Sequence, residues 1–202
     1  MNLGKRASAS IFHSSSEGVD DLAKKLRLPR SVVLANRWRW PDGTVFYHPR
    51  FRWSLLIKAV LEHFIPIFTP GGAVLYVGDT ETKFLHLDAV SLAQLGVTLD
   101  AAAKMPDVVI HDVRRHWLVL VEAVTSTGWV DGKRRMELKK LFGASKAGLV
   151  FVTAFATRRA MQTHIGLLSW ETEVWIAEFP EHMIHLNGAR FLGPYPDAFP
   201  AS

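Results

Sequence analysis

Cysteine is absent from the 202-residue sequence, which excludes disulfide bonds, thiolate zinc sites and cysteine nucleophiles. Any bound metal ion must therefore be held by carboxylates, histidines or carbonyl groups. The strongest apolar runs, residues 118–124 and 149–156, are far shorter than the roughly 20 residues that cross a bilayer, so no membrane association is expected. Residues 7–16 carry serines and a histidine in place of an apolar leader, and the sequence predicts a cytoplasmic protein without a secretory signal.

The composition is that of a folded domain. Hydrophobic residues make up 49% of the chain and charged residues 21%, which excludes a wholly disordered, collagen-like or low-complexity protein. Lysine and arginine total 24 against 19 acidic residues, a formal charge of +5. This balance favours a polyanionic partner such as nucleic acid, although a basic protein with no nucleic-acid role is equally compatible with it.

The first 50 residues are predicted to form a small N-terminal segment. Residues 20–28 have helical spacing and stop before Pro29, and Ser31 is suited to cap a second helix. Residues 38–47 contain a Pro-Asp-Gly-Thr turn and predict a hairpin. Two helices followed by a hairpin are typical of a winged helix-turn-helix. The alternative is a small lid packed on the main domain, which spans residues 51–202.

The main domain alternates helical and strand patterns. Apolar residues recur at helical spacing over residues 51–67, and Pro66 and Pro70 are predicted to end this helix. Further helices are predicted over residues 90–96, 133–142 and 157–168, and strands over residues 73–77, 83–87, 108–110, 117–124, 149–154 and 174–177. The pattern predicts an α/β fold built on one central sheet.

Asp107 and Glu122 are the candidate catalytic acids. Two apolar runs flank a polar centre in this stretch, which predicts a β-hairpin whose tip lies at Arg114 and Arg115. A tip centred there places Asp107 directly opposite Glu122. Because like charges in opposed positions destabilise a sheet, either a cation lies between the two acids or the register is shifted. A hard divalent cation, Mg²⁺ before Ca²⁺, suits two carboxylates together with water and phosphate.

Glu122 belongs to a strand that is apolar on both faces. Alternation places Glu122 on one face with residues 118, 120 and 124, and puts residues 119, 121 and 123 on the other. Such a strand is central and buried, and a buried carboxylate without a partner costs several kcal/mol or takes up a proton. The alternative to a metal site is therefore a buried ion pair of Glu122 with Arg134 or Lys133.

Several segments around these acids carry a more specific pattern. They are Gly78-Asp79-Thr80 with Lys83, Pro106–Val109, Glu122–Ser126, Lys133–Leu138, Lys146–Phe155, Trp170–Ala177 and His182–Pro194. Together they resemble the C-terminal catalytic region of the BsuBI/PstI family of type II restriction endonucleases, within the Pro-Asp…Asp/Glu-X-Lys nuclease superfamily. The likeness covers about residues 70–195, and it implies a restriction-endonuclease-like mixed central sheet flanked by helices.

The resemblance also implies an activity: Mg²⁺-dependent hydrolysis of phosphodiester bonds in double-stranded DNA by a homodimer. Asp107 and Glu122 would be catalytic and would hold the metal. The superfamily places a lysine two residues after the second acid, where it orients water and neutralises charge on phosphate. This chain has Val124 at that position, so the role of the lysine must move to another residue or be dispensed with.

Lys133 and Lys83 are the two candidates for the missing lysine. Lys133 is the first, because a helix that follows the catalytic strand can return its N-terminus to the end of that strand. A solvated Lys133 paired with Glu137 four residues later is the alternative. Lys83 is the second candidate, on a neighbouring strand after the Gly-Asp-Thr segment.

Auxiliary roles follow from the same resemblance. Asp79 is placed to complete a metal shell, with a role in its glycine turn as the alternative. Glu62 matches an auxiliary acid on the first long helix, with a surface glutamate as the alternative. DNA contacts are predicted for polar and basic residues that follow the catalytic strand, namely Thr125, Ser126, Arg134 and Arg135.

Two other functions stay open at this point. Val124 supports a non-cleaving DNA-binding or regulatory protein on a nuclease-like fold, while the retention of both Asp107 and Glu122 opposes it. The other is an enzyme that acts on RNA or on a small phosphoester.

Overall fold

The computed structural model describes Lys24, residues 37–39, 45–47, 55–79, 83–98, 104–124 and 128–186, and Gly188. Strands β1 (Arg37–Arg39) and β2 (Val45–Tyr47) pair as an antiparallel hairpin around the predicted turn. Apart from Lys24, the two helices predicted before this hairpin lie outside the described residues. The winged-helix and lid interpretations, and the domain boundary at residue 50, stay predictions.

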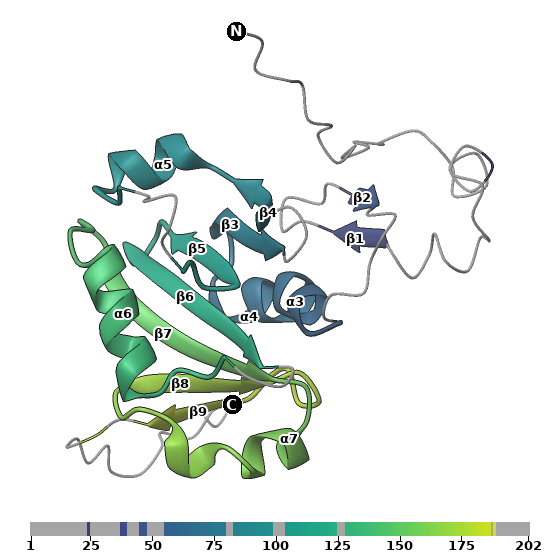
Figure 1. Ribbon diagram of the computed structural model, residues 1–202. Coiled ribbons are helices and arrows are strands. Elements are labelled where there is room, and N and C mark those ends of the chain that lie inside the picture. Colours follow the sequence, from purple (N-terminus) through teal and green to yellow (C-terminus); the bar gives the residue numbers. More distant parts are fainter. Residues whose placement is uncertain are drawn as a thin grey trace, which may run out of the picture.

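A seven-stranded mixed sheet forms the centre of the protein, in the order β4-β3-β5-β6-β7-β8-β9 (Figure 1). Strands β6, β7 and β8 run parallel, and the remaining neighbours in the sheet are antiparallel. The strands are β3 (Ala73–Asp79), β4 (Lys83–Leu87), β5 (Val108–Asp112), β6 (Trp117–Val124), β7 (Gly148–Phe155), β8 (Thr172–Ile176) and β9 (Met183–Leu186). The predicted α/β fold with a mixed central sheet flanked by helices is confirmed. The sequence pattern does not predict β9, whose four residues are too few to show a clear alternation.

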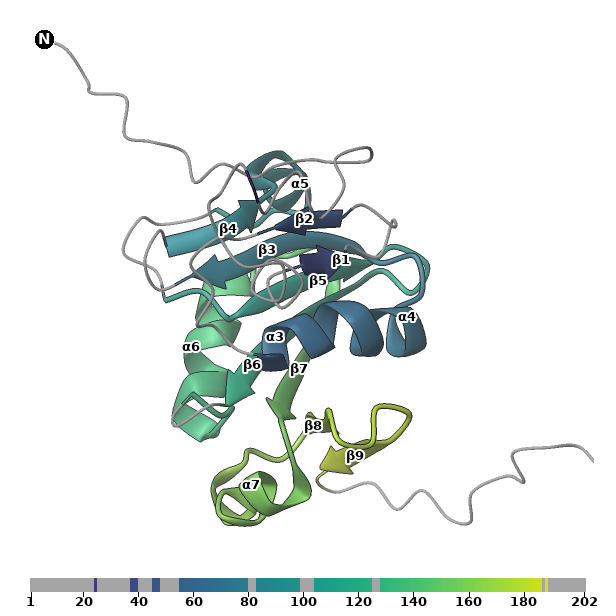
Figure 2. The same ribbon diagram turned by 90° about the vertical axis from the view of Figure 1, so that its right-hand side faces the viewer.

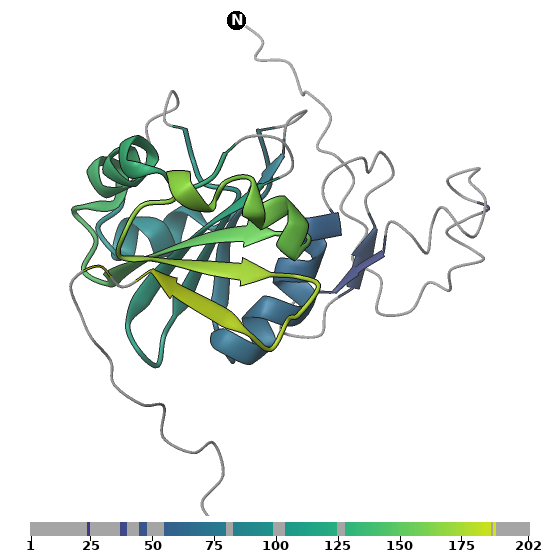
Figure 3. The same cartoon turned by 90° about the horizontal axis from the view of Figure 1, so that it is seen from below.

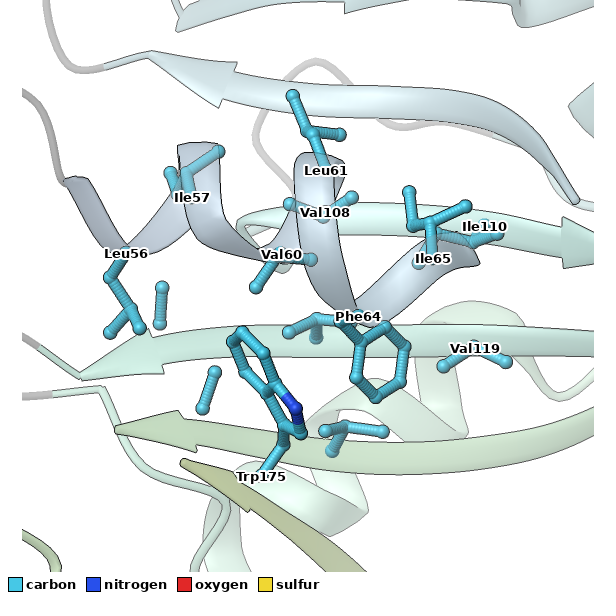
Figure 4. Close-up of a cluster of buried hydrophobic side chains, with 14 of the residues drawn as sticks. Leu56, Ile57, Val60, Leu61, Phe64, Ile65, Val108, Ile110, Val119 and Trp175 are labelled. Atoms are coloured by element: carbon cyan, nitrogen blue, oxygen red, sulfur yellow. The ribbon is translucent and has the colours of Figure 1, made fainter. Parts of the chain in front are cut away.

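One helical run covers one face of the sheet. It consists of α3 (Leu55–Ala59), the π-helical turn η1 (Val60–Phe64) and α4 (Ile65–Phe68), and Figure 2 shows it as a continuous rod. Its buried side chains form an apolar core with the sheet, in which the rings of Phe64 and Trp175 meet edge to face with centroids 5.6 Å apart (Figure 4). Pro66 lies in the first turn of α4, where a missing N–H is tolerated. The helix therefore continues to Phe68, past its predicted end.

Three helices lie on the opposite side: α5 (Ala89–Gln94), α6 (Gly132–Phe142) and α7 (Arg158–Gln162). Figure 3 shows α6 and α7, in green, and the blue helices α3 and α4 on opposite sides of the sheet. The helix predicted over residues 157–168 is divided in two, because α7 ends at Gln162 and a separate 3₁₀ turn, η2 (Ile165–Leu167), follows. No helix in the described ranges is long and apolar enough to cross a membrane.

Strand β6 is buried from Leu118 to Val124. Val119 and Val121 pack in the core under α3 and η1, whereas Leu118 and Leu120 pack in the core under α5 and α6. The predicted alternation is therefore confirmed. It places Glu122 on the side of the sheet that α6 covers.

Truncation of Phe64 tests the packing of the helical run on the sheet. The Phe64 ring is 2% exposed, and we expect Phe64→Ala to lower the free energy of unfolding by about 3–5 kcal/mol. Phe179→Ala is the control, because Phe179 is 43% exposed and its truncation should cost less than about 1 kcal/mol. Urea unfolding followed by circular dichroism measures both variants, and equal losses would contradict this packing.

Candidate active site

The hairpin of β5 and β6 brings the two candidate acids together. Its register pairs Val108 with Val121, and residues 113–116 form the turn. This is the predicted register, centred on the two arginines at the tip. Asp107, one residue before β5, therefore lies across from Glu122 near the end of β6.

Backbone contacts hold Asp107 from both sides. The N–H of Gly78 on β3 donates to the Asp107 carbonyl oxygen at 2.7 Å, and the N–H of Ala123 on β6 donates to Oδ2 at 2.7 Å. Burial raises the pKa of Asp107 above its usual value, against the lowering effects of the Ala123 hydrogen bond and of the charges on Arg134 and Lys104. The carboxyl is therefore fixed in position, but its ionised form is disfavoured.

Glu122 is 4% exposed and pairs with an arginine. Its Oε1 accepts from Arg134 Nε at 2.8 Å, and Arg134 Nη2 lies 2.7 Å from the same oxygen. Burial nevertheless raises the pKa of Glu122 to about 7; Arg134 lowers this pKa, and the charge of Asp107 raises it. The ion pair that we weighed against a metal site is thus present at Oε1, and the two acids are close enough to repel each other.

The second oxygen of Glu122 faces a glycine. Oε2 lies 3.8 Å from the position that a Cβ on Gly128 would occupy, and Gly128 has a φ of +104°, which favours glycine. A larger residue there would be strained and would place its side chain against this oxygen. Gly128 therefore leaves Oε2 without a covering side chain at this position.

The start of α6 is built so that Arg134 reaches Glu122. On β7, Oγ1 of Thr153 accepts from the N–H of Val130 at 3.1 Å, which fixes the segment that leads into the helix. Asp131 then caps the helix by accepting from the Arg134 N–H at 2.7 Å. Arg134 consequently lies in the first helical turn, beside the end of β6.

The remaining donors of Arg134 hold the chain just before Asp107. Nη2 donates to the carbonyl oxygens of Lys104 and Met105, both at 3.1 Å, and Nη1 donates to Glu137 Oε2 at 3.3 Å. The residue is 6% exposed, so its guanidinium lies in the interior and not on a surface that faces DNA. One side chain therefore connects β6, α6 and the segment that precedes Asp107.

The other basic residues expected at the site lie elsewhere. The Lys133 side chain is 86% exposed, and its Nζ lies 4.0 Å from Glu137 Oε1, which matches the alternative interpretation of this lysine. Arg135 pairs with Glu171, and its guanidinium carbon lies 5.7 Å from the centroid of the Phe151 ring. The structure brings neither residue to the two acids.

The auxiliary candidates divide into two groups. Glu62 lies in η1, on the helical run that covers the opposite face of the sheet from Glu122. Asp79 and Lys83 are neighbours in the register of β3 and β4, but their side chains lie outside the described residues. Two further candidates, Thr125 and Ser126, lie outside the described residues altogether.

Lys104 is a residue of the site that sequence reasoning missed. Its side chain is exposed, and its charge lowers the pKa of both Asp107 and Glu122. It lies in an irregular segment, where no periodicity indicates the direction of a side chain. In the sequence, only its position three residues before Asp107 indicates that Lys104 could lie near the acids.

The seven-stranded mixed sheet flanked by helices places the chain among the α/β proteins, and its β5–β6 hairpin brings two acids together. Residues 40–189 match the model of the BsuBI/PstI restriction endonuclease domain. The chain therefore belongs to the BsuBI/PstI restriction endonuclease family, as the resemblance implied.

Individual relatives agree with this family. The chain is 51% identical over 154 residues to type II restriction enzyme BsuBI of Bacillus subtilis, which covers 76% of this chain and 49% of the relative. It is 32% identical over 146 residues to type II restriction enzyme AplI of Arthrospira platensis, covering 69% of this chain and 45% of the relative. The solved structure of SdaI restriction endonuclease matches with a TM-score of 0.72 and 44% identity, over 82% of this chain and 53% of SdaI. The chain spans about half the length of these relatives.

Removing Arg134 tests the buried pair. Arg134→Met leaves Glu122 Oε1 buried without its cation, and we expect the free energy of unfolding to fall by about 3–5 kcal/mol. Adding Glu122→Gln should recover part of this loss, because a neutral amide needs no counter-charge. Lys133→Met is the matched control at an exposed position of the same helix turn, with an expected change below about 1 kcal/mol. Urea unfolding measures the wild-type protein, the Arg134→Met and Glu122→Gln single variants, the double variant and the Lys133→Met control, and additive losses in the double variant would argue against the pairing.

The raised pKa of Glu122 predicts how stability depends on pH. The folded protein keeps the proton up to about pH 7, whereas the ordinary pKa is 4.5, so the folded state binds more protons between these values. Without divalent metal, the wild-type protein should therefore lose stability relative to Glu122→Gln as the pH rises from about 4.5 to 7. The expected relative loss is on the order of 3 kcal/mol, at about 1.4 kcal/mol per pKa unit. Urea unfolding of both proteins in EDTA at pH 5 and pH 8 measures it, and an unchanged difference would disprove the raised pKa.

Proposed function

We propose that the chain carries the catalytic site of a Mg²⁺-dependent type II restriction endonuclease, which hydrolyses phosphodiester bonds in double-stranded DNA. The observation that supports this most is the pair of Asp107 and Glu122, side by side on adjoining strands of a BsuBI/PstI family fold. BsuBI and AplI, two relatives of the chain, are type II restriction enzymes by name.

The two acids fit a hard divalent cation. Both have raised pKa values because burial disfavours their ionised forms, and a cation between them would relieve that cost. Two carboxylates are sufficient for Mg²⁺, because this ion usually keeps several waters and binds through one or two carboxylates and a phosphate. Asp107 and Glu122 Oε2 would hold the ion, which supplies Lewis acidity and lowers the pKa of a bound water.

The protein itself supplies preorganisation. The Ala123 N–H fixes Asp107, and Arg134 fixes Glu122, so that neither acid has to be reoriented when substrate arrives. Hydrolysis then forms a bond from a water oxygen to phosphorus as the bond to the 3′ oxygen breaks. We also propose that Thr125, Ser126 and Arg135 contact the DNA.

For the two exposed lysines in the last turn of α6 we propose a role in DNA affinity. Lys139 and Lys140 are both exposed, and such lysines strengthen binding to the phosphate backbone in a salt-dependent way. We further propose a homodimer, because a two-fold symmetric DNA site places one active site on each strand. We also propose that the protein is cytoplasmic.

A second candidate function is a non-cleaving DNA-binding protein. It is favoured by Val124, which is 6% exposed within an apolar cluster and offers no positive charge. Both functions need the same fold and both involve DNA binding. A measurement of DNA cleavage is therefore needed to distinguish them.

Neutral replacement of either acid tests the proposed function. Asp107→Asn and Glu122→Gln should each lower the rate of plasmid cleavage in Mg²⁺ by at least about 10³-fold, because each removes a charge that acts in the transition state. Glu181→Gln is the control at an exposed acid and should cleave as the wild-type protein does. EDTA should stop cleavage, and DNA binding in Ca²⁺ should survive in all variants.

Three results would count against the proposal. Full activity of either variant would show that the acids are not catalytic. A wild-type protein that binds varied DNA but never cuts it would favour the non-cleaving alternative. Cleavage of RNA but not of DNA in a panel of substrates would show that the substrate is RNA.

A further inference from the structure

Position 124 cannot supply the lysine that related nucleases place there. Val124 packs in an apolar cluster with Phe155 on β7 and Met161 on α7. The first candidate for a replacement, Lys133, is turned to solvent beside Glu137. The site still needs a positive charge, since hydrolysis builds up negative charge on the phosphate oxygens.

The backbone of Lys104 is held directly beside Glu122. Arg134 Nη2 donates to the carbonyl oxygen of Lys104 at 3.1 Å and lies 2.7 Å from Glu122 Oε1. The same guanidinium nitrogen therefore contacts both residues. The chain then passes through the buried Pro106 to Asp107, so Lys104 is tied to the positions of both acids.

The side chain of Lys104 stays in solvent although its backbone is anchored. It is exposed, and it forms no ion pair with any acid among the described residues. Its charge nevertheless lowers the pKa of both carboxyls. The flexible side chain of a lysine whose backbone is anchored beside both acids can reach a phosphate that is bound to them.

We propose that Lys104 is the active-site lysine of this chain, that its ammonium donates to a non-bridging oxygen of the scissile phosphate, and that Arg134 is its positioning residue. This inference rests on the proposed function. The ammonium is a compact charge with three donors on a flexible stem, so it follows the phosphate as negative charge grows on the oxygens. No proton leaves Lys104 in this role.

Lys104→Ala in the full chain is the direct test, with Lys133→Ala as the matched control. Both remove one exposed lysine, so both should fold with wild-type unfolding midpoints. At saturating DNA, we expect Lys104→Ala to lower the single-turnover cleavage rate by about 10²–10³-fold and Lys133→Ala to change it by less than about threefold. Lys104→Arg should retain the rate within about tenfold, because the positive charge stays.

Binding of Mn²⁺ alone, measured by calorimetry without DNA, gives a readout that does not depend on cleavage. Loss of the Lys104 charge removes a repulsion of the cation, so Lys104→Ala should bind Mn²⁺ about three- to tenfold more tightly than the wild-type protein. Lys133→Ala should show the wild-type affinity.

The outcomes separate this inference from the proposed function. If the wild-type protein cuts DNA and Lys104→Ala cuts equally fast, the catalytic role of Lys104 is overturned while the nuclease function stands. Equal losses in Lys104→Ala and Lys133→Ala would overturn it as well, and an unchanged Mn²⁺ affinity would overturn its placement beside the acids. A wild-type protein that cuts no DNA overturns both proposals together.

Discussion

The buried contact between Glu122 and Arg134 is the interaction on which the rest of the site depends. Glu122 belongs to a strand with apolar packing on both faces, where an unpaired carboxylate costs several kcal/mol. Arg134 offsets this cost with two nitrogens on one oxygen and uses its remaining donors on the carbonyls of Lys104 and Met105. A lysine has no planar fork and cannot make these contacts at once. The direction of Glu122, the start of α6 and the path of the chain before Asp107 therefore depend on one guanidinium.

This ion pair neutralises Glu122 only in part. A carboxylate fully satisfied by arginine has a lowered pKa, yet the pKa of Glu122 is raised to about 7, because burial and the charge of Asp107 outweigh Arg134. Oε1 is engaged, whereas Oε2 faces Gly128. The acids thus keep an electrostatic cost that a divalent cation can remove. Groups held in such a disfavoured state cluster at functional sites, and the incomplete pairing is what suits these acids to a metal.

Much of this arrangement is predictable from sequence, because it depends on local patterns. The apolar runs on either side of Arg114 and Arg115 are long enough to define the hairpin register, and alternation along β6 then assigns Glu122 to its face. The partners of the acids are harder to predict. Which arginine of α6 turns inward depends on where the helix begins. The local cap at Asp131 and the tertiary contact with Thr153 determine this together, and the second of them is not visible in the sequence. Lys104 lies in an irregular segment, so no pattern indicates its side chain, and β9 and the π turn η1 are too short to be recognised.

The valine at position 124 follows from the way this end of the sheet is packed. Val124 lies in one apolar cluster with Met161 of α7 and Val174 of β8. A lysine at this position would bring its ammonium into that cluster, where burial disfavours the charge. The apolar contact of residue 124 with Met161 of α7 is therefore incompatible with a charged lysine at position 124. Because β6 ends in apolar packing, the positive charge of the proposed mechanism would have to come from a segment that the alternation along β6 does not constrain. The chain before β5 meets this condition, because its backbone is anchored by Arg134 while the side chain of Lys104 stays in solvent.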